Sequence, residues 1–132
     1  MIKNIAALCL LGLCGAIAAI PASAADVSRD ARCRVWQTNA IEYAGACRFW
    51  PEDGGSFSLT FPTGEEGGDL RRYHITRIRV RVIRPGVAEV GEPDRPADRR
   101  WGRALRSSRD RGCWSASGLD PAAAAFWMVC AH

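Results

Sequence analysis

The residues best suited to chemistry are three arginines that alternate along positions 73–84. Arg77, Arg79 and Arg81 occupy every second position, so an extended chain carries them on one face, about 6.5–7 Å apart. Guanidinium groups at that repeat suit planar, bidentate contacts with successive phosphates, sulfates or carboxylates. The spacing therefore predicts an anion-binding surface. The alternative is a solvated sheet face whose charge is partly neutralised by acids on neighbouring strands.

A second basic segment, residues 95–111, holds seven arginines and two aspartates. Its binding candidates are Arg99, Arg100, Trp101 and Arg103, and an extended chain would put Trp101 and Arg103 on one side. Aromatic rings interleaved with arginine suit stacking on single-stranded nucleic acid. An exported chain instead meets anionic envelope polymers and other exported proteins, so these are the expected partners and nucleic acid is not.

Groups that could support catalysis are sparse. The two histidines are His74, which shares a face with the aliphatic residues of its segment, and His132, the last residue. We expect His74 to be structural or to lie at the margin of the core, since a lone histidine outside any motif is weak evidence for a catalytic base. The acidic pairs at 52–53 and 65–66 lie in polar turns, and there is no glycine-rich phosphate loop or nucleophile elbow. The sequence predicts a protein that is not an enzyme and needs no cofactor.

The first 24 residues predict a secretory signal. Lys3 supplies the positive charge, residues 5–20 form the apolar segment, and Ala22-Ser23-Ala24 supplies the small residues before the cleavage point. An uncleaved anchor is the alternative. We expect a mature chain of residues 25–132, one small β-domain, in the periplasm or secreted from a bacterial cell, with no further segment able to span a membrane.

Four cysteines follow the expected signal, and an even number in an exported chain predicts two disulfides. Sequence allows three pairings, and we favour Cys33–Cys47 and Cys113–Cys130 because each pair brackets a short, hairpin-sized segment. No two cysteines have Cys-x-x-Cys spacing, so a metal centre is not expected. Trp114 lies next to a cysteine, and we expect it to pack in the core.

Charge is divided unevenly along the chain. Every basic residue after Lys3 is arginine; residues 26–70 carry a net charge of −4 and residues 71–132 a net charge of +7. Two arrangements fit this division. The acidic and basic strands face one another within the fold, or the second half presents a basic face to an anionic partner.

Hydrophobic alternation predicts a mainly all-β fold, a small antiparallel barrel or sandwich of about six to eight short strands. The clearest strand is residues 73–84, where Ile78, Val80 and Val82 alternate with the arginines. Pro85-Gly86 should turn this strand back through a three-residue loop that pairs Val82 with Val90. A helical turn is expected near residues 120–125. The other expected strands are residues 32–37, 41–43, 46–50, 57–61, 87–91, 101–106, 112–117 and 126–131.

Three local stretches resemble small exported bacterial proteins of unknown function. They are residues 45–49 with 54–57, residues 101–104, and Cys113-Trp114 with Cys130-Ala131. The segment between Cys113 and Cys130 is longer here than in those proteins. The resemblance agrees with two disulfides and a β-fold, and it implies no activity and no site residue.

Together these features predict an exported, non-catalytic binding or interaction domain with an arginine-rich face. The alternatives are a structural or assembly component of the cell envelope and an inhibitor of a secreted enzyme.

Overall fold

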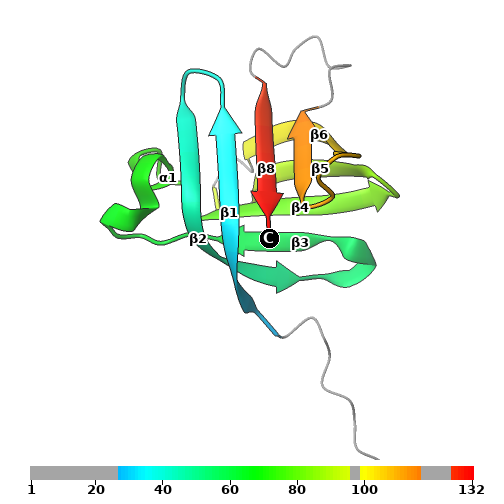
Figure 1. The fold of residues 1–132 in the computed structure, drawn as a ribbon, viewed down its shortest axis with the longest axis horizontal. Helices are drawn as coiled ribbons and strands as arrows, with labels where there is room; N and C mark the ends of the chain where they lie inside the picture. Colours follow the sequence, from blue (N-terminus) through cyan, green and yellow to red (C-terminus); the bar gives the residue numbers. More distant parts are fainter. Residues whose placement is uncertain (1–26, 96–98, 117–125) are drawn as a thin grey trace, which may run out of the picture.

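The chain folds into a closed barrel of eight antiparallel strands, each hydrogen-bonded to the next in sequence order (Figure 1). The structure, a computed structural model, describes residues 27–95, 99–116 and 126–132. The expected signal at 1–24 and the expected helical turn near 120–125 lie outside these residues. The strands are β1 (Arg29–Gln37), β2 (Ile41–Pro51), β3 (Phe57–Thr60), β4 (Arg77–Arg84), β5 (Val87–Glu92), β6 (Arg99–Arg106), β7 (Cys113–Ala116) and β8 (Trp127–Ala131).

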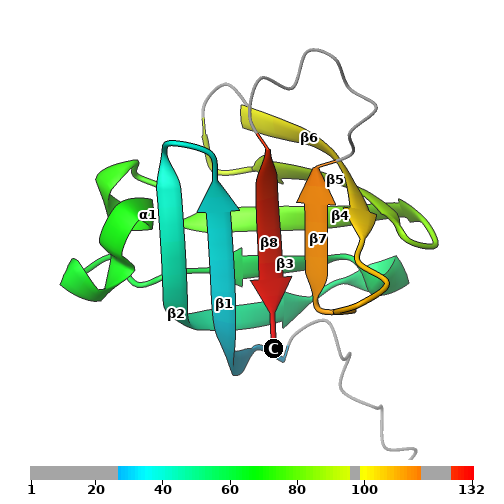
Figure 2. The same cartoon turned by 45° about the horizontal axis from the view of Figure 1, so that its top comes forward.

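Closure comes from β1, which pairs with β2 on one side and with β8 on the other. Figure 2 shows β2, β1, β8 and β7 side by side across the front, with β3 to β6 behind them. The all-β prediction is confirmed, and the structure decides for a barrel over a sandwich. The strands expected at 41–43 and 46–50 form one strand, because Ala44 and Gly45 continue the pairing with β1.

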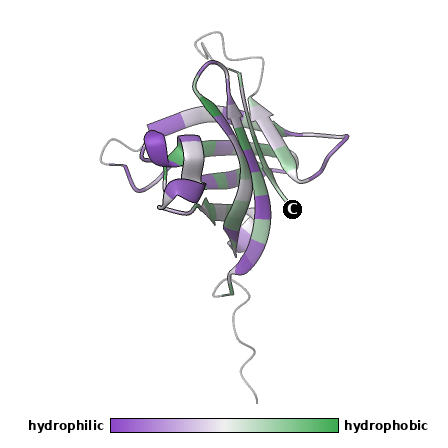
Figure 3. Cartoon of the chain, turned by 60° about the vertical axis from the view of Figure 1, so that its left-hand side comes forward, coloured by the Kyte–Doolittle hydropathy of each residue, from purple (hydrophilic) through white to green (hydrophobic). Residues whose placement is uncertain are grey.

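The core is the barrel interior, filled by the residues at alternate strand positions. Leu59, Ile78 and Val80 are fully buried there, while the arginines between the aliphatic residues of β4 point outward. Figure 3 shows the resulting alternation of apolar and polar bands along the strands. The alternation predicted for Ile78 and Val80 is confirmed.

The β4–β5 hairpin differs from the expected three-residue loop. Val82 pairs with Ala88 and Val80 with Val90, and Pro85-Gly86 forms a two-residue turn between Arg84 and Val87. The strand pairing shifts between Val82 and Arg84, so β4 has one extra residue there. This bulge allows a two-residue turn while the aliphatic side chains of both strands still face inward. The expected Val82–Val90 pair was wrong, although the aliphatic face is preserved.

The strand expected from residue 73 begins at Arg77. Before it lie a 3₁₀ turn, η3 (Glu65–Gly67), and a short helix, α1 (Gly68–Arg72), which stands beside β2 (Figure 1). Leu70 of α1 is fully buried, so this segment contributes to the core. The Ile75 amide donates to the Leu70 carbonyl at 2.8 Å and directs the chain from α1 towards β4.

Both expected disulfides are confirmed. Cys33–Cys47 joins β1 to β2, and Cys113–Cys130 joins directly paired positions of β7 and β8. Trp114 is buried, as expected. Within the described residues, no helix is both long enough and apolar enough to cross a membrane.

Candidate functional site

A groove on the outer surface of β4, β5 and β6 gathers four of the predicted binding arginines. Its volume is about 390 Å³. We call it the arginine groove. Its lining residues are Arg79, Arg81, Glu89, Val90, Gly91, Pro93, Arg100, Gly102 and Arg103.

Strand register brings these side chains together. Arg79 lies opposite Gly91, Arg81 lies opposite Glu89, and Glu89 in turn lies opposite Arg103. Side chains at directly paired positions of antiparallel strands are close enough to interact. Gly91 takes an outward position between the arginines of β4 and β6 without contributing a side chain.

A register shift in β6 places two arginines on the outside. Val90 pairs with Gly102 and Gly91 pairs with Arg100, which leaves Trp101 as the extra residue. Arg100 and Arg103 therefore both line the groove although they are three residues apart, a spacing that a regular strand would put on opposite faces. Gly102 allows this, since its φ of 120° lies in a region that favours glycine.

The expectation that Trp101 shares a face with Arg103 was wrong, because the same bulge turns the indole inward. The Trp101 ring packs edge-on against Trp127, with ring centroids 5.7 Å apart. Its Nε1 donates to Glu92, and the Trp127 Nε1 donates to the Trp101 carbonyl. Trp101 packs against the core and is not a stacking platform beside the arginines.

Three of the arginines of β4, namely Arg77, Arg79 and Arg81, each face an acid from a neighbouring element. Arg81 bonds to Glu89, and Arg79 lies 2.8 Å from Glu52. The Nε of Arg77 lies 3.4 Å from Asp94, an ion pair without hydrogen-bond geometry. These ion pairs partly neutralise the charge of Arg77, Arg79 and Arg81, which we call the arginine ladder.

Glu52 is the most constrained of these acids. It accepts a hydrogen bond from the buried Ser58 hydroxyl at 2.6 Å with one oxygen and bonds to Arg79 with the other. Arg79 therefore belongs to a network that includes a buried group. Arg77 and Arg81 form simpler, half-exposed pairs.

Positive charge dominates the groove electrostatically. The pKa of Glu89 is held below its usual value, first by the hydrogen bond from Arg81; desolvation opposes this effect, and the charges of Arg81, Arg100 and Arg103 lower the pKa further. One carboxylate therefore meets the fields of several guanidinium groups. An anion entering the groove would meet the same fields.

Besides Trp101, two predicted arginines lie outside the groove lining. Arg99 is exposed at the start of β6, and Arg77 lies at the edge with Asp94. Sequence reasoning missed Glu89 and Gly91. The alternation along β5 could have predicted them, because residues 89 and 91 must face outward if Val90 faces the core.

The histidines do not form a catalytic arrangement among the described residues. His74 is exposed and has a φ of 57°, so it faces solvent, where a core or marginal position was expected. His132 lies 3.1 Å from Asp110, and these two lie near the sulfur of Cys113. That sulfur is bonded to Cys130 and is not a thiolate, so the cluster offers two metal-binding donors rather than three.

Comparison of the chain with protein-family models, with curated proteins and with solved structures finds no match. We therefore infer function from the groove and from the barrel that shapes it.

Proposed function

We propose that this protein is an exported, non-catalytic binding domain whose arginine groove binds an anionic group of a cell-envelope polymer. The observation that carries the proposal is the convergence of Arg79, Arg81, Arg100 and Arg103 on one concavity with a single carboxylate, Glu89, among its lining residues. Guanidinium groups on adjacent strands suit bidentate contacts with sulfate, phosphate or carboxylate. Two disulfides and the expected signal support a periplasmic or secreted location.

The groove supports this function better than the ladder from which the prediction began. Arg77 pairs with Asp94 outside the groove lining, and Arg100 and Arg103 add charge to the groove from the β6 side. A Cβ added at Gly102 would meet no atom within 4 Å, so the backbone there leaves open space. A sulfated or phosphorylated polymer fits a groove of this kind, and an acidic exported protein is the alternative partner.

Retention on heparin tests the proposal. The double variant Arg100→Gln/Arg103→Gln should elute at clearly lower salt than the wild type, because it loses the β6 side of the groove. The matched control is Arg32→Gln/Arg34→Gln, two exposed arginines on β1, across the barrel from β5. Equal shifts for both double variants would show that net charge alone determines retention and would overturn the proposal.

The ion pairs of the ladder favour a second function, a structural or assembly component whose charges complement one another internally. Exposed ion pairs contribute only about 0–1 kcal/mol each. If the proposal holds, the triple variant Arg77→Gln/Arg79→Gln/Arg81→Gln loses at most a few kcal/mol of stability and also loses heparin retention. A large loss of stability with retention unchanged would favour the structural function instead.

A further inference from the structure

We propose a second binding site, independent of the arginine groove, in which one end of the barrel holds a compact amphiphilic anion. This end, which we call the mouth, is formed by the 3₁₀ turn η2 (Asp53–Gly55), the Pro85-Gly86 turn and the loop at 107–112. A cavity of about 610 Å³ opens there. Its apolar base and its basic rim come from strands on both sides of the barrel.

One side of the mouth is a stack of three side chains from three strands. The Arg29 guanidinium lies 4.4 Å from the centroid of the Phe49 ring. Phe49 stacks on Phe57, with centroids 4.9 Å apart and an angle of 25° between the planes. A guanidinium held over an aromatic face keeps its N–H edges available for an anion.

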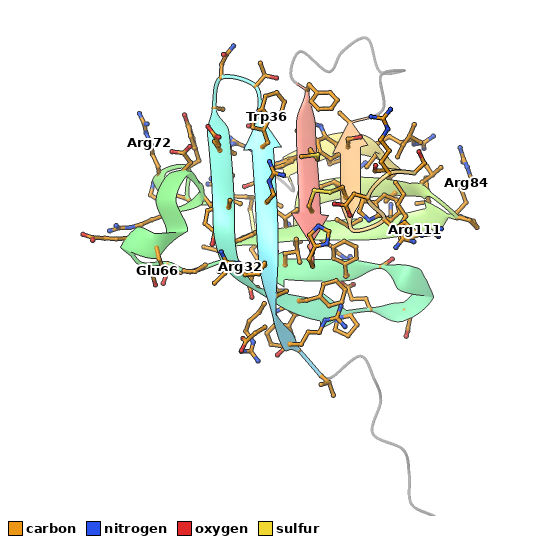
Figure 4. The ribbon with its side chains drawn as sticks, in the orientation of Figure 1. Arg32, Trp36, Glu66, Arg72, Arg84 and Arg111 are labelled. Atoms are coloured by element: carbon orange, nitrogen blue, oxygen red, sulfur yellow. A yellow bond between two sulfur atoms is a disulfide. The ribbon has the colours of Figure 1, made fainter. Side chains whose placement is uncertain are left out.

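The other side repeats this pairing. The Arg106 guanidinium lies 5.7 Å from the centroid of Trp114, and its Nε donates to the Arg111 carbonyl at 2.6 Å. Arg111 adds a third cation from the loop at 107–112. In Figure 4, Arg111 lies on the opposite side of β8 from Arg32, which projects near β1.

Strand pairing places each arginine beside an aromatic ring. Arg29 is paired with Phe49 and Arg106 with Trp114. Arg29 is the first residue of β1 and Arg106 the last residue of β6, and both are exposed, so each places a charge at the end of the barrel next to an apolar surface. A ligand that needs a cation beside an apolar surface fits this placement.

The rim is open and carries no acid among the residues that line it. A Cβ added at Gly54, Gly55 or Gly86 would meet no atom within 4 Å, so the backbone there leaves space for a ligand. The nearby Asp110 is engaged by His132 and by the Gly112 amide. An anion at the rim would therefore meet three cations without a competing carboxylate in the lining.

The base of the cavity limits the size of the ligand. Below Phe57 and Val82 the interior is filled, since Leu59 and Val80 are fully buried. An apolar group can cover Phe49, Phe57 and Trp114 but cannot enter the barrel. The ligand class is therefore a carboxylate or phosphate attached to one aromatic ring or a short aliphatic chain, rather than a long acyl chain.

Titration of the isotopically labelled protein with 4-phenylbutyrate, followed by NMR, tests this site. We expect saturable shifts at the Trp114 indole and at the amides of Gly54, Gly55 and Gly86. The neutral 4-phenylbutan-1-ol and the short anion acetate should each bind at least about tenfold more weakly, because each lacks one half of the recognition. Equal affinity of either compound, or shifts confined to other regions, would overturn the proposal.

Two variants make the test specific. Arg29→Gln/Arg111→Gln removes two rim cations and should weaken phenylbutyrate binding about tenfold or more, while Arg32→Gln/Arg34→Gln should bind like the wild type. Ser108→Trp places a large side chain at the rim and should block binding without touching the core. Unchanged binding in both Arg29→Gln/Arg111→Gln and Ser108→Trp would refute the site. Heparin retention through the groove should persist in Ser108→Trp, so failure at the mouth and failure at the groove are distinguishable.

Discussion

The indole Nε1 of Trp101 donates a 2.8 Å hydrogen bond to Oε2 of Glu92, a residue that is only 2% exposed. Every second residue of β5 faces inward, and Glu92 follows Ala88 and Val90 in this series. Its carboxylate is therefore buried in the barrel. The Nε of Arg95 lies 3.3 Å from the other carboxylate oxygen. Trp101 and Arg95 together meet the hydrogen-bonding needs of an acid that has lost its contact with water.

Replacing Trp101 with Phe should destabilise the barrel by about 1–3 kcal/mol, because the buried carboxylate of Glu92 loses a donor while most of the ring packing remains. Urea unfolding followed by circular dichroism measures the change. The control Trp36→Phe alters a partly exposed indole and should change stability by less than about 0.5 kcal/mol. Equal effects of the two variants would show that the Glu92 bond contributes nothing.

Substitution of Arg81 by Gln should raise the pKa of Glu89 towards its ordinary value of 4.5, since Arg81 is the main cause of the lowered pKa. A lowered pKa in the folded state means that Glu89 stabilises the fold above about pH 4.5, and that this contribution disappears as the pH falls through the folded-state pKa. Carbon-detected NMR of the carboxyl group measures the shift. A smaller rise is expected for Arg103→Gln, which acts through charge alone. A larger rise for Arg103→Gln than for Arg81→Gln would contradict the assignment of the main cause.

Alkaline pH should weaken the protein through Tyr43. Burial raises the pKa of this phenol above 10.0, the charge of Arg32 partly opposes the rise, and Glu66 adds to it. The hydroxyl also donates to the Ala46 carbonyl. A raised folded-state pKa means that the stabilisation is complete below about pH 10 and is lost as the pH rises through the folded-state value.

Urea unfolding at pH values from about 8 to 11 tests this prediction, and Tyr43→Phe should remove most of the dependence. The chain suits the measurement, because it has no lysine after Lys3 and arginine does not titrate in this range. The other tyrosine, Tyr73, is exposed. An unchanged pH profile in Tyr43→Phe would refute the assignment.

Removing either disulfide should cost about 3 kcal/mol, since the bonded cysteines are separated by 14 and 17 positions. The double variant Cys33→Ala/Cys47→Ala should lose more than Cys113→Ala/Cys130→Ala, because the first pair packs within the main apolar cluster while the second, although buried, lies outside it. Urea unfolding of both variants, beside the reduced wild type, separates the lost crosslink from the lost packing. The reverse order of stability would contradict this account.

The parts of the fold that depend on local pattern were predictable from the sequence. Ile78, Val80 and Val82 predicted β4 because alternation is a property of neighbouring residues. The position of Trp101 was not predictable in the same way, since its inward orientation depends on a bulge opposite Val90 and Gly91 in another strand. One extra residue reversed the side on which the indole lies.

The two candidate sites illustrate the same limit. The arginines of the groove were singled out from their spacing, but Glu89 joins them only through the register between β4 and β5. Arg29 and Arg106 gave no sequence signal at all. They lie far apart along the chain, and each acquires its significance from the aromatic ring that strand pairing puts beside it.

The pairing of β1 with β8 limits the ways in which this protein can recognise a partner. Along residues 33–37 the backbone of β1 is hydrogen-bonded on both sides, and the remaining strands each lie between two neighbours. A partner cannot join the sheet there as an added strand, which is a common mode of peptide capture. Recognition along this stretch of β1 must instead use side chains. The same pairing protects this stretch from edge-to-edge aggregation.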